Sequence, residues 1–296
     1  MAVTRRNYSL LAGDYAKVKA FLREHYVPFG AGPFVLEEWW EYMHTLPWLV
    51  YYSLHRIGLW EDDGRLVAVA AYEMELGEAF LWSDEAYTDL YPELVAYAEE
   101  RLSRVNKDGK RELIVEAHSS RPEELRYLEE KGYTTVWADE WPTYEFSQGI
   151  PEPTLPEGYR LVRLDEIDPA DYKRLNDAIW QGFHNGEGEG NLEGFLNTMI
   201  APSFRKELTY AAQDASGDFC GYGSAWFNPY HRYGYLEPLC VHPKHQRKGL
   251  ASAIVFRLMR DLSGLGATYM TGGFVEFYKR IGYRGVCTRT HVQKTW

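Results

Sequence analysis

The sequence predicts an α/β fold in two tandem domains, because one order of strands and helices occurs twice along the chain. A Gly-Tyr pair closes each copy, at Gly132 and at Gly282, with an offset of 150 residues. The hairpin glycines Gly64 and Gly217 are 153 residues apart. An offset that stays nearly constant over a domain indicates a duplication.

The connector between the copies lies in residues 147–158, which contain three prolines and two glycines. Such a segment favours an extended chain without helix or sheet. We therefore predict a boundary near residue 150, with domains over 1–150 and 151–296. A chain of 296 residues agrees with about two domains.

In the first half, Asp63-Gly64 between two apolar runs predicts a hairpin. Apolar residues three or four positions apart predict the helices. The predicted elements, in order, are a strand at 7–11, helices at 14–26 and 36–46, hairpin strands at 51–60 and 65–74, a strand at 79–82, a helix at 92–102, a strand at 111–117 and a helix at 122–131.

The second half repeats this order, with Ser216-Gly217 as the hairpin turn. The predicted elements are a strand at 159–164, helices at 170–183 and 192–200, hairpin strands at 208–213 and 219–227, a strand at 235–241, a helix from 249, a strand at 268–271 and a helix at 274–281.

The strand at 235–241 and the helix after it form the most informative stretch. Pro238 interrupts the strand and removes a ladder donor, so we expect a bulge or an opening there. The helix begins at or just before Gly249, and its first amides have no intrahelical partner, which makes this end an anion site. Arg247 and Lys248 add positive charge, and small residues leave room for two linked phosphates.

This stretch resembles a loop of the GNAT superfamily of acyl-CoA-dependent N-acetyltransferases, because Gln246-Arg247-Lys248-Gly249-Leu250-Ala251 follows Val241-x-Pro243. The resemblance implies two GNAT-like domains, each with a mixed, mostly antiparallel sheet flanked by helices. It also implies that the loop amides hold the coenzyme A pyrophosphate and that the strand edge pairs with pantetheine. The alternative is a surface helix with a solvated basic first turn. The implied cofactor-binding residues are Leu239, Cys240, Val241, Gln246, Arg247, Lys248, Gly249, Leu250 and Ala251.

The composition favours a cytoplasmic enzyme without a membrane partner. Hydrophobic residues make up 45% and aromatic residues 16% of the chain, which is enough for two cores. No apolar run approaches the ~18 residues of a membrane helix, and the first residues lack the apolar core of a signal peptide. Cys220, Cys240 and Cys287 lie far apart, so we expect buried thiols, no disulfide and no metal site.

The formal net charge of -11 argues against nucleic acid as a partner, because phosphate backbones select basic surfaces. The same charge would attract a cationic acceptor. An acidic surface that only keeps the protein soluble explains the charge equally well.

The first half lacks the phosphate loop. Ser83 to Tyr91 contains three carboxylates and no glycine, and these carboxylates would repel a pyrophosphate. We expect a degenerate GNAT-like domain there. Its aromatic residues could line a substrate cleft, although such residues more often belong to the core. They are Trp39, Trp40, Trp48, Tyr51, Tyr52, Trp60, Trp82, Trp137 and Trp141.

Acyl transfer to an amine requires a proton acceptor for the amine and a donor for the departing thiolate. The donor predicted is Tyr278, because Phe277-Tyr278-x-x-x-Gly282-Tyr283 resembles the closing motif of GNAT enzymes, whose tyrosine protonates the coenzyme A sulfur. A core tyrosine is the alternative. The first-half counterpart is Leu128, which has no hydroxyl.

The base predicted is Glu237, which precedes the break at Pro238 and matches a carboxylate that GNAT enzymes often carry on this strand. A structural salt bridge to Arg232 or another cation is the alternative. His184 and His231 are weaker candidates for the base. His242 and His245 are expected to flank the cofactor loop.

Two further segments bear on the site. Residues 182–190 contain four glycines with Glu187 and Glu189, so they could shape a site for a cationic acceptor or form a solvated connector. Gly272-Gly273 replaces an asparagine that is often found in GNAT enzymes, which puts one contact to pantetheine in doubt.

Together these features predict transfer of the acetyl group of acetyl-CoA to a primary amine of a small molecule or a peptide. We expect the C-terminal domain to catalyse it and the N-terminal domain to shape the acceptor cleft or a homodimer interface. A silent acyl-CoA-binding sensor or assembly module is the alternative. Tyr278 argues against that alternative, because binding alone needs no acid.

Overall fold

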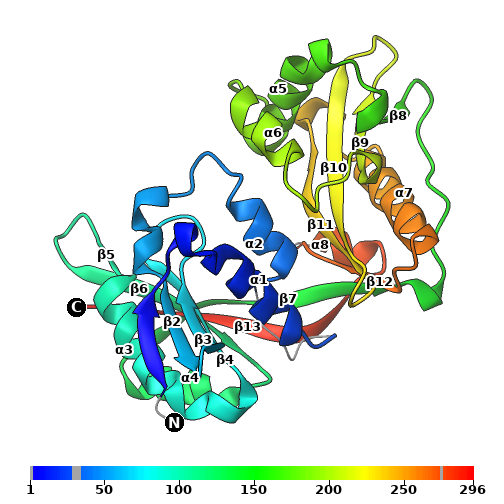
Figure 1. Ribbon diagram of the computed structural model, residues 1–296. Coiled ribbons are helices and arrows are strands. Elements are labelled where there is room, and N and C mark those ends of the chain that lie inside the picture. Colours follow the sequence, from blue (N-terminus) through cyan, green and yellow to red (C-terminus); the bar gives the residue numbers. More distant parts are fainter. Residues whose placement is uncertain (1–2, 29–34, 274–275) are drawn as a thin grey trace. The chain divides into compact units, whose positions relative to one another are not determined.

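The computed structural model describes residues 3–28, 35–273 and 276–296. The chain divides into two compact units (Figure 1). Unit 1 comprises Met1–His44, Trp48–Glu140 and Val286–Trp296, and unit 2 comprises Thr45–Pro47 and Trp141–Gly285.

Unit 1 is built on a mixed sheet with the strand order β1-β2-β3-β4-β6-β13, and β5 pairs with the outer part of β6. Only the pairing of β4 with β6 is parallel among these described pairs. The elements are β1 (Thr4–Asn7), α1 (Asp14–Glu24), α2 (Glu37–Met43), β2 (Gly58–Asp62), β3 (Arg65–Ala71), β4 (Glu78–Ser83), α3 (Tyr91–Arg101), β5 (Arg104–Val105), β6 (Arg111–His118), α4 (Pro122–Glu130) and β7 (Thr134–Glu145).

Unit 2 repeats this plan with the order β7-β12-β11-β10-β9-β8, in which the described parallel pair is β11 with β12. Both units therefore have the predicted mixed, mostly antiparallel sheet. The elements are β8 (Arg160–Arg163), α5 (Tyr172–Phe183), α6 (Leu192–Met199), β9 (Thr209–Gln213), β10 (Phe219–Asn228), β11 (Tyr233–Val241), α7 (Leu250–Gly264), β12 (Tyr269–Thr271), α8 (Glu276–Arg280) and β13 (Arg284–Thr295).

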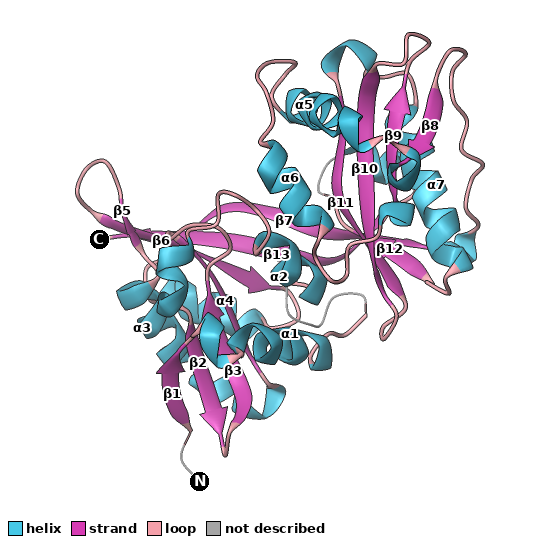
Figure 2. Ribbon diagram, turned by 45° about the horizontal axis from the view of Figure 1, so that its top comes forward, coloured by secondary structure: helices cyan, strands magenta, loops and turns pink. Residues whose placement is uncertain are grey.

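Helices cover both faces of each sheet (Figure 2). In unit 1, Val69 and Trp82 face α1 and α2, while the Trp60 indole donates a hydrogen bond to Glu93 of α3 at 2.9 Å. In unit 2, Ile254 of α7 packs in one core, and Tyr222 of β10 packs with α5 in another. The apolar stripes of the helices thus pack against the two sheets and form the hydrophobic cores of the units.

Strands β7 and β13 cross between the units. The end of β7 pairs with β12 in unit 2, and β13 returns to pair with β6 in unit 1. The units are therefore not consecutive stretches, as a single boundary near residue 150 would make them. Our sequence-based prediction contains neither strand, because β7 includes Pro142 and shows little apolar alternation, and β13 is largely polar.

Other predicted elements also differ from the structure. The strand predicted at 7–11 is wrong, since β1 ends at Asn7 and a 3₁₀ helix over Leu10–Ala12 follows. A second 3₁₀ helix over Tyr51–Arg56 replaces the start of the strand predicted at 51–60. The helix predicted at 274–281 begins in residues 274–275, which lie outside the described residues. Cys287 is half-buried rather than buried.

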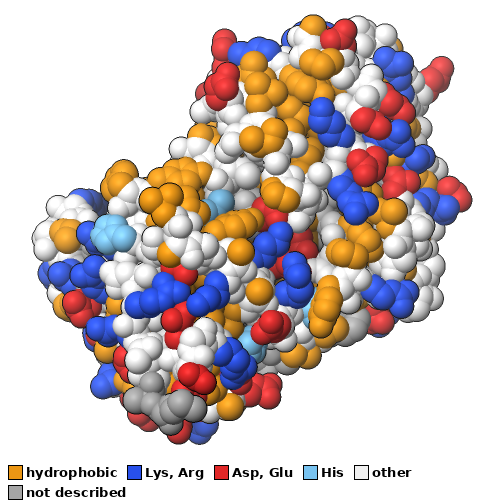
Figure 3. Space-filling view, in the orientation of Figure 1, with side chains coloured by type: hydrophobic (Ala, Val, Ile, Leu, Met, Phe, Trp, Pro, Cys, Tyr) orange, Lys and Arg blue, Asp and Glu red, His pale blue; other side chains and the backbone are white. Residues whose placement is uncertain are grey.

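No helix in the described ranges combines the length and apolar character needed to span a membrane. On the face shown in Figure 3, Lys and Arg side chains are interspersed with Asp and Glu side chains. This face therefore presents no continuous basic surface of the kind that binds nucleic acid.

Candidate active site

The predicted break in β11 is a bulge. Leu236 pairs with Ala225 and Leu239 pairs with Gly223, so Glu237 and Pro238 lie opposite a single residue of β10. An extra residue on one strand bends it and redirects its side chains. The prediction made from Pro238 is confirmed.

Strands β11 and β12 pair only from Tyr233 to Tyr235, with Tyr269 to Thr271. Beyond this point the described residues form no further pairs, which leaves an opening beside residues 236–241 of β11. We call this free edge the β11 opening. It starts at Leu236, one residue before Glu237.

Three residues of β11 are predicted to meet pantetheine, namely Leu239, Cys240 and Val241, and their backbone groups point in two different directions. The His242 amide donates to the Cys220 carbonyl of β10 at 2.9 Å. Because bonded positions alternate along an antiparallel pair, Cys240 also bonds toward β10, and Leu239 and Val241 direct their polar groups to the β11 opening. The side-chain amide of Gln246 donates a hydrogen bond to the Val241 carbonyl at 3.1 Å. Cys240 instead packs against α5, and burial raises the pKa of its thiol to about 12.

The loop before α7 exposes a row of backbone amides. Gly249 caps α7 with a φ of 87° and Arg247 has a φ of 59°, both in the left-handed region. The first amide bonded in this helix is that of Ala253, which donates to the Gly249 carbonyl at 3.0 Å. Among the described residues, no acceptor meets the backbone amides of 247–252. The exposed Arg247, Lys248 and Gly249 therefore surround a site suited to an anion.

Tyr159 holds this loop, and sequence reasoning missed it. Its hydroxyl lies 2.8 Å from the Lys248 Nζ and 3.0 Å from the His245 Nδ1. Lys248 is thus directed toward the start of β8 instead of moving freely in solvent. A contact across 89 residues leaves no local pattern that could have revealed it.

Tyr278 lies in the core of unit 2 with 8% of its surface exposed. Its ring packs edge to face against Phe277 at 5.0 Å and Tyr283 at 5.2 Å between centroids. Burial, and to a smaller extent the Glu237 charge, raises the pKa of Tyr278 above its ordinary value. In the described part of the chain its hydroxyl has no hydrogen-bond partner. The tyrosine is therefore a neutral, unengaged proton donor within electrostatic range of Glu237.

Glu237 is half-buried, and burial raises the pKa of its carboxyl group to about 7. Its carboxylate meets no cation among the described residues. Arg232 donates to the Gly266 carbonyl at 2.9 Å, so the alternative of a salt bridge between Glu237 and Arg232 is wrong. The Trp226 indole donates to the Glu237 carbonyl at 3.0 Å and fixes the backbone of the bulge. Glu237 can therefore exchange a proton near neutral pH.

Gly272 and Gly273 stand where an asparagine was expected, and packing explains them. A Cβ at Gly272 would lie 2.7 Å from the Leu236 carbonyl, and one at Gly273 would overlap the Tyr278 ring. Both glycines have positive φ. They allow the backbone at 272–273 to lie close against both Leu236 of β11 and the Tyr278 ring, where a side chain would not fit.

The other predicted residues lie outside this arrangement. His184 stacks on Trp180 at 3.6 Å. His242 caps the 3₁₀ helix Pro243–His245, which comes directly before the loop at 246–251, and their place beside a cofactor stays a prediction. Glu189 pairs with Lys173 at 3.0 Å, which ties part of 182–190 to α5. This pairing favours the connector interpretation of the segment. The described residues form no group of three His, Cys, Asp or Glu suited to a metal ion.

Unit 1 fills the corresponding opening with its own side chains. Past the pairing of β4 with β6, Arg121 donates to the Ser83 carbonyl at 2.9 Å, and its guanidinium lies 3.7 Å from the Trp82 ring centroid. Asp84 caps a 3₁₀ helix, which leads directly into α3. Unit 1 therefore presents a filled strand edge and an acidic turn in place of the loop.

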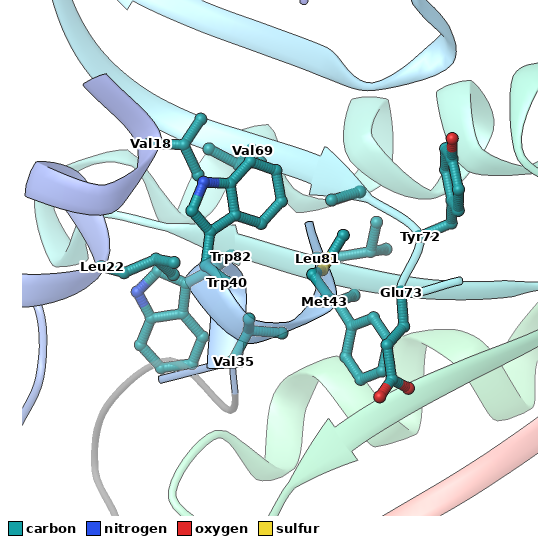
Figure 4. Close-up of a pocket in the computed structure, with 12 residues that line it drawn as sticks. Val18, Leu22, Val35, Trp40, Met43, Val69, Tyr72, Glu73, Leu81 and Trp82 are labelled. Carbon is teal, nitrogen blue, oxygen red and sulfur yellow. The ribbon is translucent and has the colours of Figure 1, made fainter. Parts of the chain in front are cut away.

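The aromatic residues of unit 1 divide between core and surface. Trp40 and Trp60 are 1% exposed, whereas Trp48 is 49% and Trp137 is 43% exposed. Figure 4 shows Trp40 and Trp82 beside a narrow apolar cavity between α1, α2 and the sheet. The buried members serve the core, which is the more common role of such residues.

Comparison with known proteins agrees with this geometry. Residues 172–283 match the model of the acetyltransferase (GNAT) family. No curated protein matches the chain.

Several solved structures share the fold over nearly the whole chain. A GCN5-related N-acetyltransferase from Sphaerobacter thermophilus has a TM-score of 0.68 at 17% identity, over 99% of this chain and 95% of that one. A tandem GNAT protein from the clavulanic acid biosynthesis pathway has a TM-score of 0.66 at 13% identity, over 99% and 98%. An N-myristoyltransferase of Saccharomyces cerevisiae with bound myristoyl-CoA has a TM-score of 0.59 at 12% identity, over 99% and 79%.

Proposed function

We propose that the chain is a GNAT-type acyltransferase of the tandem kind, because residues 172–283 match the model of the acetyltransferase (GNAT) family and structures with this fold cover nearly the whole chain. From this premise we propose that it transfers the acetyl group of acetyl-CoA to a primary amine and that unit 2 catalyses the reaction. The observation that carries the proposal is the placement of Tyr278 and Glu237 beside the β11 opening, with the anion-binding loop at its other end.

The loop and the strand edge would fix the orientation of acetyl-CoA, with its pyrophosphate at the loop and its thioester near Glu237. The amides of 247–252 and the Arg247 guanidinium would bind the pyrophosphate. Pantetheine would extend along the backbone polar groups of Leu239 and the Val241 amide, as a peptide-like strand adds to a free sheet edge. The thioester would then reach the bulge at Glu237.

Glu237 and Tyr278 would move the two protons of the reaction. Glu237 accepts a proton from the ammonium form of the acceptor, and the neutral amine nitrogen then attacks the thioester carbonyl carbon. The carbon–sulfur bond breaks, the thiolate takes the Tyr278 proton, and the phenolate recovers a proton from the cationic nitrogen, which leaves the amide, free coenzyme A and one proton on Glu237. Because the Glu237 charge helps to raise the pKa of Tyr278, protonation of Glu237 makes the phenol a stronger acid when the thiolate departs.

The geometry of the β11 opening favours a short acyl group. The opening ends where Tyr235 pairs with Thr271, two residues before Glu237. A chain longer than acetyl would have to enter this paired region or turn out of the sheet. The net charge of -11 supports a cationic acceptor, since it raises the local concentration of cations.

Coenzyme A release should test the activity directly. With acetyl-CoA and a panel of polyamines, aminoglycosides and peptide amines, we expect free thiol to appear with at least one amine. Myristoyl-CoA should give no release, because its chain is too long for the opening. If acetyl-CoA binds but no amine releases thiol, the protein is the acyl-CoA-binding sensor instead.

Glu237→Gln should lower turnover by about 10²-fold, because glutamine cannot accept the amine proton. In the wild type, kcat/KM should rise with pH and level off above about pH 7, where Glu237 is ionised. Glu157→Gln, on the exposed connector, is the matched control and should keep wild-type rates. An unchanged pH profile in Glu237→Gln would remove Glu237 from the mechanism.

The same substitution should stabilise the fold. Because the folded-state pKa of Glu237 is raised to about 7, the free energy of unfolding is highest at low pH, where the buried carboxyl is neutral, and falls as the pH rises toward 7. Glutamine stays neutral at every pH and so avoids this decrease, which amounts to roughly 3 kcal/mol at most above pH 7. Melting temperatures at pH 5 and pH 8 should therefore differ less in the variant than in the wild type.

Titration calorimetry should give one acetyl-CoA per chain. Unit 1 cannot offer a second site, because Arg121 occupies the strand edge and carboxylates replace the loop. A stoichiometry of two would show that unit 1 opens and binds the cofactor.

A further inference from the structure

A polar cavity of about 450 Å³ lies in unit 1, beside the start of β4. Its lining includes the carboxylates of Glu73, Glu75 and Glu78, the guanidinium of Arg104 and the indole of Trp48. Three carboxylates against one guanidinium make this lining acidic. The cavity has no part in the acetyl transfer proposed above, and the inference drawn from it does not depend on that function.

The guanidinium does not neutralise the lining. Arg104 donates to Glu112, outside the lining, at 2.7 Å and lies 3.2 Å from Glu75. Glu78 meets no lysine or arginine in the part of the chain that the structure describes, and its side chain is 34% exposed. The cavity therefore contains an accessible carboxylate whose charge is not balanced by a Lys or Arg.

Behind Glu78 lie His291 and Glu116, two buried residues with atoms that have no hydrogen-bond partner. His291 is 5% exposed and Glu116 is 3% exposed. The His291 Nδ1 is aimed at the Glu78 carboxylate, 3.6 Å away, and its Nε2 is 3.3 Å from Glu116. Neither ring nitrogen forms a hydrogen bond, and one Glu116 oxygen also has none. Buried polar groups are normally satisfied, so this cluster beside a cavity points to a missing ligand.

The Trp48 indole adds an aromatic surface to the acidic lining of the cavity. Trp48 is 49% exposed, and an aromatic face attracts an ammonium group while its ring packs against methylene groups. We propose that this cavity binds an aliphatic diamine or polyamine, with one ammonium group on Glu78 and the methylene chain along Trp48.

Calorimetry of the full chain with hexane-1,6-diamine, without acetyl-CoA, tests the proposal. We expect saturable binding to one site in unit 1. Glu78→Gln should weaken it about tenfold or more, because a charge-assisted hydrogen bond is lost. Trp48→Leu should weaken it about two- to fivefold. Hexane-1,6-diol, which has no charge, should not bind.

Two controls assign the binding. Glu130→Gln removes an exposed carboxylate of α4 in the same unit and should leave affinity unchanged. Glu237→Gln removes the carboxylate of the proposed catalytic centre, so weaker binding in this variant would assign the diamine to the acceptor site instead. Equal weakening in Glu130→Gln, or a loss in Glu237→Gln without one in Glu78→Gln, would overturn the proposal. Should Glu78→Gln fail to fold, Glu75→Gln tests the same lining, and an unchanged affinity there would overturn it.

Discussion

Replacing Tyr278 with phenylalanine is expected to lower turnover by about 10²- to 10⁴-fold, the usual contribution of a general acid. The ring and its contacts with Phe277 and Tyr283 remain, so the fold should persist. Acetyl-CoA affinity should change little, because the hydroxyl acts only when the carbon–sulfur bond breaks. Steady-state thiol release and calorimetry together measure both effects.

Tyr283 provides a matched control for this substitution. Its hydroxyl is also buried, it has no hydrogen-bond partner, and its ring packs against Tyr278. Tyr283→Phe should leave turnover within a few fold and should stabilise the fold by about 1 kcal/mol, because an unsatisfied buried hydroxyl is removed. Equal losses of activity in the two variants would mean that Tyr278 only packs, and its role as acid would have to be withdrawn.

Gly249→Glu is expected to abolish acetyl-CoA binding, with a loss of on the order of 10²-fold or more in affinity. No atom lies within 4 Å of a Cβ placed at Gly249, so the carboxylate would occupy the space where the pyrophosphate should lie. Its negative charge would oppose the phosphates and compete for the first amides of α7. Calorimetry with acetyl-CoA measures the change.

Two controls separate charge from backbone strain. Gly217→Glu introduces the same charge at a glycine with a φ of +82° and open space around it, on the β9–β10 turn, and should bind normally. Gly249→Asn introduces a residue that tolerates the left-handed region and carries no charge, so this variant should retain most of its affinity for acetyl-CoA. An unchanged affinity in a folded Gly249→Glu protein would show that the cofactor binds elsewhere.

Strand β11, the loop after it and helix α7 were predictable because their signals are local. Pro238 predicts the bulge, Gly249 predicts the start of α7, and the apolar stripe after it predicts the helix, which forms over Leu250–Gly264. The duplicated order of elements also predicts the two similar sheets. Each inference depends on residues that are close in sequence, where backbone preferences and periodicity determine the conformation.

The sequence did not predict that β7 and β13 run from one unit into the other. Strand β13 pairs with β6, more than 150 residues earlier in the chain, and its polar sequence shows no alternation. The pairing partner of a strand depends on which sheet edge is available after folding. Glu237 shows the same limit, because its pKa of about 7 results from burial by distant segments.

The sequence by itself determined the duplicated α/β plan, the anion-binding loop at Arg247 to Gly249 and Tyr278 as a candidate acid. Only the tertiary structure decided that the Glu237 charge acts on Tyr278, that Tyr159 holds the loop and that Arg121 fills the opening of unit 1. The physical reason is distance along the chain. Helices, turns and caps follow from neighbouring residues, whereas burial, charge pairing and the filling of an opening depend on residues that only folding brings together.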